Sequence, residues 1–217
     1  MINLIFAAIV LSCLMLSVSS RIKSCIHIVA IQGAIVSLFP LLLNAIDTEL
    51  LVLVVITISV KAIILPLMLL RSMRIAAVRR EVEPLISYPI SIAVSIAGLL
   101  FSLWIASRLP VSETIHGSSL MIVAPFFMMF TGLFLIVSRT KALTGIMGYL
   151  VFENGIYLFG GVLGLEHNFI VEVGILLDVL VMVFVAGVAI FHINRKFDHI
   201  DTGRLTHLNE DPMDGER

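Results

Sequence analysis

Four side chains that can take part in proton transfer fall inside apolar stretches of this sequence. Glu153, followed by Asn154, interrupts the run GIMGYLVFENGIYLFGG, and Lys61, Asp178 and Gln32 interrupt three other apolar runs. Placing Lys or Asp at the bilayer centre costs at least about 2.5–3.5 kcal/mol on insertion scales, so such residues usually have a partner, a water path or a task. Carboxyl and amino groups can exchange protons without a cofactor. The pattern predicts a proton relay of Glu153, Asp178, Lys61 and Gln32.

The depth of these residues supports the same interpretation. Glu153 and Asp178 each lie roughly 10 to 12 residues into their apolar runs, which at about 1.5 Å per residue is near the middle of a hydrocarbon core about 30 Å thick. Lys61 reaches a similar depth, and Gln32 lies somewhat nearer the inner side. Polar residues far apart in the sequence are therefore expected at similar depths.

A structural interpretation of the same residues stays open. In it, Lys61 and Asp178 form an ion pair that only holds helices together, and Glu153 is capped by a neighbour on its own helix. The three candidate caps are Asn154, Tyr149 and Tyr157.

Cofactor and metal chemistry find little support in the sequence. His27 and His192 both fall near helix ends on the inner side, which in outline would suit a bis-histidine haem, but neither has a matched partner motif. Cys13 and Cys25 lie in or beside apolar runs without metal-ligand spacing, so we interpret them as packing residues. The sequence has no nucleophile–base pair, Gly-rich phosphate loop or metal quartet. We expect no cofactor and no metal.

The composition places these residues in a membrane. Of the 217 residues, 59% are hydrophobic and 13% are charged, against roughly a quarter charged in a typical soluble domain. The mean hydropathy is +1.12. A net charge of -1 offers no polycationic surface for nucleic acid. The first twenty residues lack a basic start and a small-residue cleavage site, so they predict a retained first span rather than a signal peptide.

The apolar runs predict an all-α integral membrane protein with about seven transmembrane helices. We expect these helices at residues 2–20, 24–46, 50–70, 86–107, 118–138, 142–164 and 169–193. Basic residues cluster after the first, third, fifth and seventh helices, in the connections with Arg21 and Lys23, with Arg71, Arg74, Arg79 and Arg80, with Arg139 and Lys141, and with Arg195, Lys196 and Arg204. Because basic loops favour the cytoplasmic side, the amino terminus is expected outside and the carboxyl terminus inside the cell membrane.

The sequence also contains an internal repeat of three helices. IQGAIVSLFPLLL aligns with FENGIYLFGGVLG, so Gln32 corresponds to Glu153. ELLVLVVITISVKAIILP aligns with EHNFIVEVGILLDVLVMV, so Lys61 corresponds to Asp178. One added helix between the units makes the repeats parallel rather than inverted. The expected division is a first repeat at 1–70, an inner basic loop and spacer helix at 71–117, a second repeat at 118–196 and a polar cytoplasmic tail at 197–217.

A family resemblance accompanies this repeat. The run SRTKALTGIMGYLVFENGIYLFG followed by VEVGILLDVLVMVFVAGVAIFHINRK resembles the three-helix K-type subunit of complex I and the C subunit of multisubunit cation/proton antiporters. The whole chain is similar to component E of the hydrogenase-4 and formate hydrogenlyase group. In the small subunit a glycine and a leucine precede the first membrane glutamate. Here Gly148 and Leu150 hold those places, Glu153 comes one turn later, and Asn154 matches an asparagine of the family. The second glutamate would fall at Val183, more than a turn after Asp178.

The resemblance implies a non-catalytic membrane subunit of a hydrogenase-4-type, complex I-like oxidoreductase complex. Such a subunit would contribute to proton translocation, or to the coupling of redox chemistry to ion movement. Its partners would be other membrane subunits, especially antiporter-like ones, within the lipid bilayer. Two other functions stay open, namely a stand-alone small transporter and a purely structural helix spacer in a membrane complex.

Overall fold

The structure is a computed structural model of the 217-residue chain. It describes residues 2–43, 47–75, 86–109, 119–139 and 141–163, together with Gly174, Asp178, Val181, Phe184, Val185 and Gly187. The described part is helical, in the order α1 (Ile2–Val18), α2 (Ile22–Leu38), α3 (Pro40–Leu43), α4 (Thr48–Ile58), the π-helical turn η1 (Ser59–Ile64), α5 (Leu65–Ile75), α6 (Tyr88–Arg108), α7 (Leu120–Ser138) and α8 (Ala142–Val162).

In the described part of the chain, five helical stretches are long and apolar enough to cross a membrane. They are Ile22–Leu42, Thr48–Arg74, Pro89–Arg108, Leu120–Ser138 and Ala142–Val162, and the shorter Asn3–Val18 is also apolar. Over the described residues the prediction of an all-α fold with helices able to span a membrane is therefore confirmed. The predicted helix at 169–193 falls mostly outside the described residues, as does the predicted tail at 197–217, so the count of seven remains a prediction.

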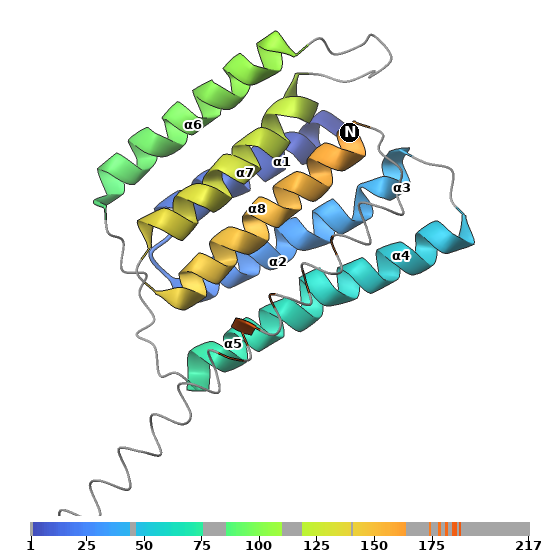
Figure 1. Ribbon diagram of the computed structural model, residues 1–217, viewed down its shortest axis with the longest axis horizontal. Helices are drawn as coiled ribbons and strands as arrows, with labels where there is room; N and C mark the ends of the chain where they lie inside the picture. The colour runs from blue at the N-terminus through green and yellow to red at the C-terminus, as the bar shows by residue number, and fades with distance from the viewer. Residues whose placement is uncertain are drawn as a thin grey trace, which may run out of the picture.

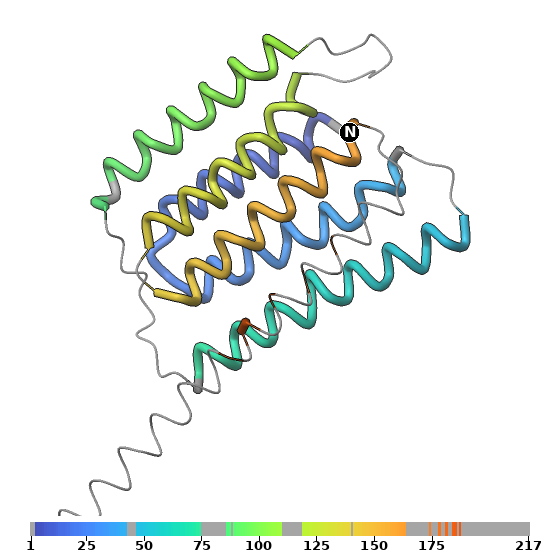
Figure 2. Tube along the Cα trace, viewed as in Figure 1, coloured from blue at the N-terminus to red at the C-terminus, as the bar shows by residue number. Residues whose placement is uncertain are grey.

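The helices form a central group with one element at each edge. In Figure 1, α1, α2, α7 and α8 lie in the middle, α6 lies along one edge, and α4, η1 and α5 lie along the other. The tube in Figure 2 follows the same path. In the central group α7 contacts α8 and α1, and α2 contacts α8. The candidate residues Gln32 and Glu153 therefore belong to helices that touch.

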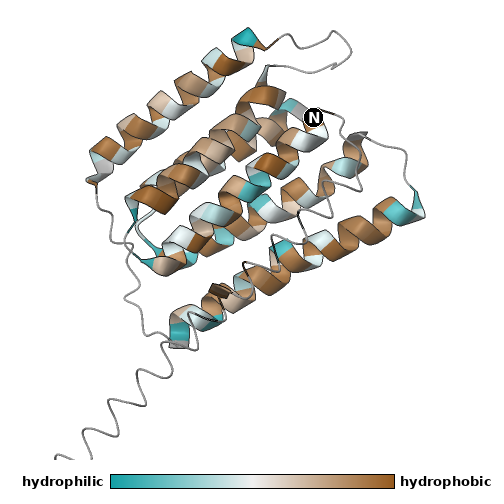
Figure 3. Cartoon of the chain, viewed as in Figure 1, coloured by the Kyte–Doolittle hydropathy of each residue, from teal (hydrophilic) through white to brown (hydrophobic). Residues whose placement is uncertain are grey.

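The outer helices present apolar side chains outward. The outer helix α6 is far less buried than α8: only 22% of its apolar stretch is buried, against 67% for α8. Leu100, Phe101 and Trp104 of α6 are more than half exposed, and hydrophobic colour covers α6 and α4 in Figure 3. Such faces are typical of contact with lipid tails or with other membrane helices.

A stripe of small residues attaches α6 to the central group. Ser91, Ser95, Gly98 and Ser102 recur at intervals of four, three and four residues, and the three serines are buried. The Ser95 and Ser102 hydroxyls donate to carbonyls one turn earlier, so they do not need partners on α7. A Cβ added at Gly98 would overlap the Phe130 ring of α7. Small residues of this kind let membrane helices approach closely.

Glycines also bring α7 and α8 into backbone contact. A Cβ added at Gly148 would lie 2.8 Å from the Gly132 carbonyl oxygen and 2.9 Å from the Ile136 nitrogen. At Gly155 the added atom would lie 3.0 Å from the Pro125 carbonyl oxygen. Because these neighbours are backbone atoms, they cannot move aside as a flexible side chain could. The close crossing of α7 and α8 fixes the rotation of α8 about its own axis, and with it the direction of the face that carries Glu153.

Gly148→Ala is therefore expected to lower the stability of the fold by about 1–3 kcal/mol, the usual effect of overpacking. The matched control is Gly145→Ala on the same helix, where an added Cβ meets no atom within 4 Å. Thermal unfolding of the purified chain in a mild detergent measures the difference. Equal midpoints for the two variants would show that the crossing tolerates more separation than the structure indicates.

Candidate functional site

One ammonium group meets two carboxylates inside the helix group. The Lys61 Nζ atom donates to Glu153 Oε1 at 2.6 Å and lies 4.0 Å from Asp178 Oδ1. It also donates to Asn154 Oδ1 at 3.2 Å. Lys61, Glu153 and Asp178 are 5%, 2% and 1% exposed. The structure thus brings together three of the four residues proposed from the sequence as a relay. We call Lys61, Glu153 and Asp178 the buried triad.

Three different helical segments supply the triad. Lys61 lies in η1, which joins α4 to α5, and Glu153 lies midway along α8. Asp178 is one of the described residues of the predicted last helix and is itself helical. Neighbouring helical residues point about 100° apart, yet Glu153 and Asn154 both reach Nζ because the lysine side chain is long. Each member of the triad thus comes from its own segment.

The triad holds more negative than positive charge when all three groups are ionised. Two carboxylates share one ammonium, and the buried atoms Glu153 Oε2 and Asp178 Oδ1 have no hydrogen-bond partner within the part of the chain that is described. Each carboxylate lies within 4.0 Å of the same ammonium, so the triad has more groups able to accept a proton than cations to pair with them.

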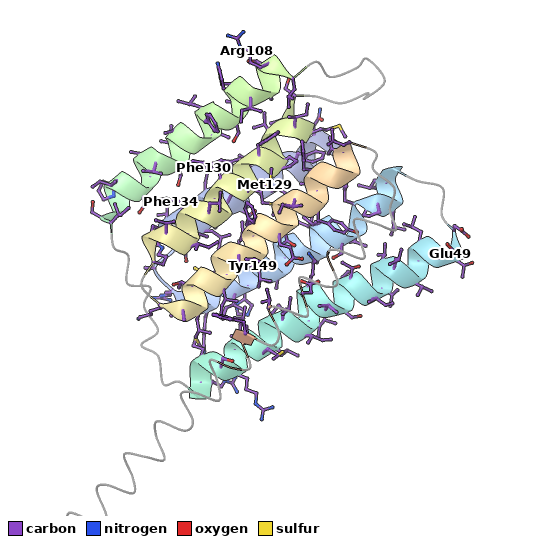
Figure 4. The ribbon with its side chains drawn as sticks, viewed as in Figure 1. Glu49, Arg108, Met129, Phe130, Phe134 and Tyr149 are labelled. Carbon is purple, nitrogen blue, oxygen red and sulfur yellow. The ribbon has the colours of Figure 1, made fainter. Side chains whose placement is uncertain are left out.

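Two tyrosines of α8 border the triad. The Lys61 ammonium lies 5.3 Å from the ring centroid of Tyr157, within the range of a cation–π interaction. Tyr149, one turn before Glu153, is only partly buried. It is labelled on α8 in Figure 4. Tyr149 thus adds a second phenol to α8, one turn from Glu153.

The structural interpretation paired Lys61 with Asp178 and gave Glu153 a cap from Asn154, Tyr149 or Tyr157. The charged atoms of Lys61 and Asp178 do lie 4.0 Å apart, within ion-pair range. The shorter contact of Lys61 is with Glu153, and the Asn154 side-chain oxygen accepts from Lys61. The direct Lys61–Glu153 pair was not anticipated. Their similar depth was the signal that could have suggested it.

Gln32 belongs to a neighbouring polar cluster. Its Nε2 atom donates to Ser12 Oγ at 2.7 Å and to Cys13 Sγ at 3.4 Å, both on α1. The next residue, Gly33, is the one that touches Lys61. The structure therefore places Gln32 beside α1 rather than in contact with the triad, because successive residues of α2 face different helices.

Arg139, which the sequence places in a basic connection after the fifth predicted helix, is buried. Only 6% of it is exposed, and its Nη2 atom donates to the Ser17 carbonyl oxygen at 3.0 Å, at the end of α1. Charge counting along a sequence cannot separate a surface cation from one that satisfies the carbonyls of a helix end. Arg139 thus links the α7–α8 turn to α1.

The residues considered for cofactors and metals are also placed in part. Cys13 and Cys25 are buried free thiols, as expected for packing residues. His27 is exposed, and its Nδ1 atom lies 2.7 Å from the Lys23 carbonyl oxygen, whereas His192 is outside the described residues. The residues that the structure describes contain no group of three or more His, Cys, Asp or Glu side chains able to hold a metal ion.

Comparison with known proteins gives one clear relative. No family model matches the chain, and no solved structure matches it. The chain is 30% identical over 193 residues to the "Uncharacterized protein Rv0085" of Mycobacterium tuberculosis (strain ATCC 25618 / H37Rv). The similarity covers 87% of this chain and 87% of that protein.

Proposed function

We propose that this chain, which belongs to the same family as the uncharacterized protein Rv0085 of Mycobacterium tuberculosis, is a non-catalytic membrane subunit. In this proposal it moves protons within a hydrogenase-4-type, complex I-like assembly of the cell membrane. The observation that carries the proposal is the buried triad, in which Lys61 pairs with Glu153 while Asp178 lies 4.0 Å away. Neighbouring membrane subunits supply the redox chemistry and the rest of the proton path.

The excess of carboxylates favours a relay over a purely structural ion pair. A structural pair needs one carboxylate for one ammonium, and the second carboxylate adds a burial cost without adding a cation. The triad keeps both Glu153 and Asp178, each with a buried oxygen that lacks a hydrogen-bond partner among the described residues. A group that loses and regains a proton explains why both are retained.

The helix contacts support the proposed pair of parallel three-helix repeats. In the sequence alignment α1 corresponds to α7 and α2 to α8, and these corresponding helices contact each other. Lys61 corresponds to Asp178, and their charged atoms lie 4.0 Å apart. Corresponding elements meet in this way when two copies of a unit pack around a two-fold axis. The spacer helix of this layout, α6, lies at the edge (Figure 1).

Copurification tests the subunit assignment. A tagged full-length chain, extracted from its native membrane in a mild detergent, is expected to bring down antiporter-like membrane subunits and a metal-cluster oxidoreductase, identified by mass spectrometry. The triad and the wide apolar faces of α4 and α6 need neighbours or lipid to cover them. A well-behaved monomer that transports a substrate by itself would refute the assignment and favour the stand-alone transporter.

The proposed orientation places the start of α4 outside and the end of α5 inside. We expect Asp47→Cys to react with a membrane-impermeant thiol reagent added to whole cells, and Arg74→Cys to react only after the membrane is opened. Asp47 and Arg74 are exposed, whereas the native Cys13 and Cys25 are buried and give little background. The reverse pattern of labelling would invert the topology.

A further inference from the structure

A π-helical turn interrupts the helix that carries Lys61. This turn, η1, spans Ser59–Ile64 between α4 and α5, and Lys61 is its buried residue. An α-helix turns about 100° per residue, so the one extra residue of a π-helical turn changes by about that angle the direction in which α5 residues point relative to α4.

The sequence just after η1 favours this wider turn. Pro66 has no backbone N–H, and in an α-helix its ring would clash with the carbonyl four residues earlier, that of Ala62. The Leu65 N–H bonds instead to the Val60 carbonyl, five residues back. The widened turn therefore has a local cause in Pro66.

Gly33 on α2 packs closely against the backbone of Lys61. A Cβ added at Gly33 would lie 3.1 Å from Lys61 Cβ and 3.2 Å from the Lys61 carbonyl oxygen. Both distances are shorter than ordinary van der Waals contact, so a larger residue would push the Lys61 segment away from α2. The ammonium of Lys61 is held at 2.6 Å from Glu153 from this position.

We propose that η1 is the device that positions Lys61, with Pro66 and Gly33 as its positioning residues, and that straightening η1 into an α-helix withdraws the ammonium from Glu153. The π-helical turn is the less common geometry, and π-helical turns occur frequently at functional sites. When η1 straightens, its extra residue becomes part of a regular α-helical turn, and α5 rotates against α4 by about 100°. The ammonium then stays in the triad beside Asp178, which lies 4.0 Å from Nζ, so the fold keeps its buried cation while Glu153 loses its partner. A neighbouring subunit that shifts α5 would thereby control whether Lys61 pairs with Glu153. This regulation rests on the proposed relay, because it acts on the same site.

The Lys61–Glu153 distance tests the device directly. Solid-state NMR on the full-length chain, in the assembly that copurifies with it, can detect dipolar coupling between isotope-labelled lysine amines and glutamate carboxyls. The Glu153→Gln variant identifies the part of the signal that belongs to this pair. We expect Pro66→Ala to lose that part, because an alanine N–H allows the turn to close as an α-helix. Gly33→Ala is expected to lose it as well, because its methyl group displaces Lys61.

Gly145→Ala, with open space around its added methyl group, should keep the full coupling. If Gly33→Ala does not accumulate, Pro66→Ala decides alone, since replacing a helix-interior proline by alanine favours the helix. Full coupling in folded Pro66→Ala, or in folded Gly33→Ala, overturns the proposal. The measurement reports a distance, so it gives the same answer whether or not Glu153 moves protons. Failure of the relay would appear instead as unchanged proton transport in Glu153→Gln, while the parental chain still shows the Lys61–Glu153 dipolar coupling.

Discussion

Replacing Lys61 by methionine is expected to prevent the folded chain from accumulating in the membrane. The change keeps an unbranched side chain but leaves Glu153 and Asp178 buried without their cation. Removing one partner of a buried pair costs about 3–5 kcal/mol, a large share of the roughly 5–15 kcal/mol that stabilises a typical native protein. The measurement is the yield of a sharply eluting, fluorescently tagged chain after extraction in a mild detergent.

Two control variants show whether charge is the cause. Glu49→Gln also removes one charge, but at an exposed position in the first turn of α4, so the yield should stay at the parental level. The triple variant Lys61→Met, Glu153→Gln, Asp178→Asn removes every charge of the triad and should recover most of the yield. A parental yield for Lys61→Met alone would mean that the two carboxyl groups can be buried in the neutral, protonated form when Lys61 is absent. The ion pair would then contribute little to folding.

The triple variant also separates two explanations of the triad. A helix spacer would keep charges because they hold helices together, so removing all of them should weaken the fold. Replacing buried ion pairs by neutral groups of similar size is often harmless or stabilising. A stable triple variant would show that folding does not need the charges. Their presence would then call for a task such as proton transfer.

The positions of the described helices along the chain could largely be predicted from the sequence. Long apolar runs between basic connections predicted the helices, with ends that differ from the observed ones by a few residues. For instance, the second predicted helix, 24–46, is observed as Ile22–Leu38 followed by Pro40–Leu43. Hydropathy gives such segments because every backbone polar group in a bilayer must be satisfied within a helix. The depth of Lys61 and Glu153 followed from the same runs.

What the sequence did not predict depends on which faces meet. Lys61 and Glu153 are 92 positions apart, and depth alone left Asp178 equally available as the partner. Gln32 has the right depth but faces α1, because its direction is set by the turn of α2. The π-helical turn was not predicted either. Its signal in the sequence was Pro66, because a proline inside a helix removes one N–H donor and clashes with the carbonyl four residues earlier.

If the chain is the proposed subunit, the exchange Glu153→Gln is expected to lower proton translocation while electron transfer through the proposed assembly continues. Glutamine keeps the shape of the side chain and its hydrogen bonding but has no titratable proton. A positioned proton-transfer group typically contributes at least about 10²-fold to the step it serves, so we expect the translocation rate to fall by about that factor. Proton uptake can be followed with a pH-sensitive dye in proteoliposomes, and electron transfer with a soluble acceptor in the same preparation.

The position of the carboxylate can then be varied along α8. Leu150 lies one turn before Glu153 and is also buried, so Leu150→Glu in the Glu153→Gln background returns a carboxylate to the turn where the resembling small subunits carry theirs. This double variant is expected to regain part of the translocation, whereas Leu150→Gln in the same background should regain none, because it adds bulk and polarity without a proton. Since Glu153→Gln removes a charge beside Lys61, the yield of each variant is measured alongside its transport. If Glu153→Gln assembles and pumps like the parent across the pH range, Glu153 serves only to neutralise Lys61, and the proton path does not pass through this helix.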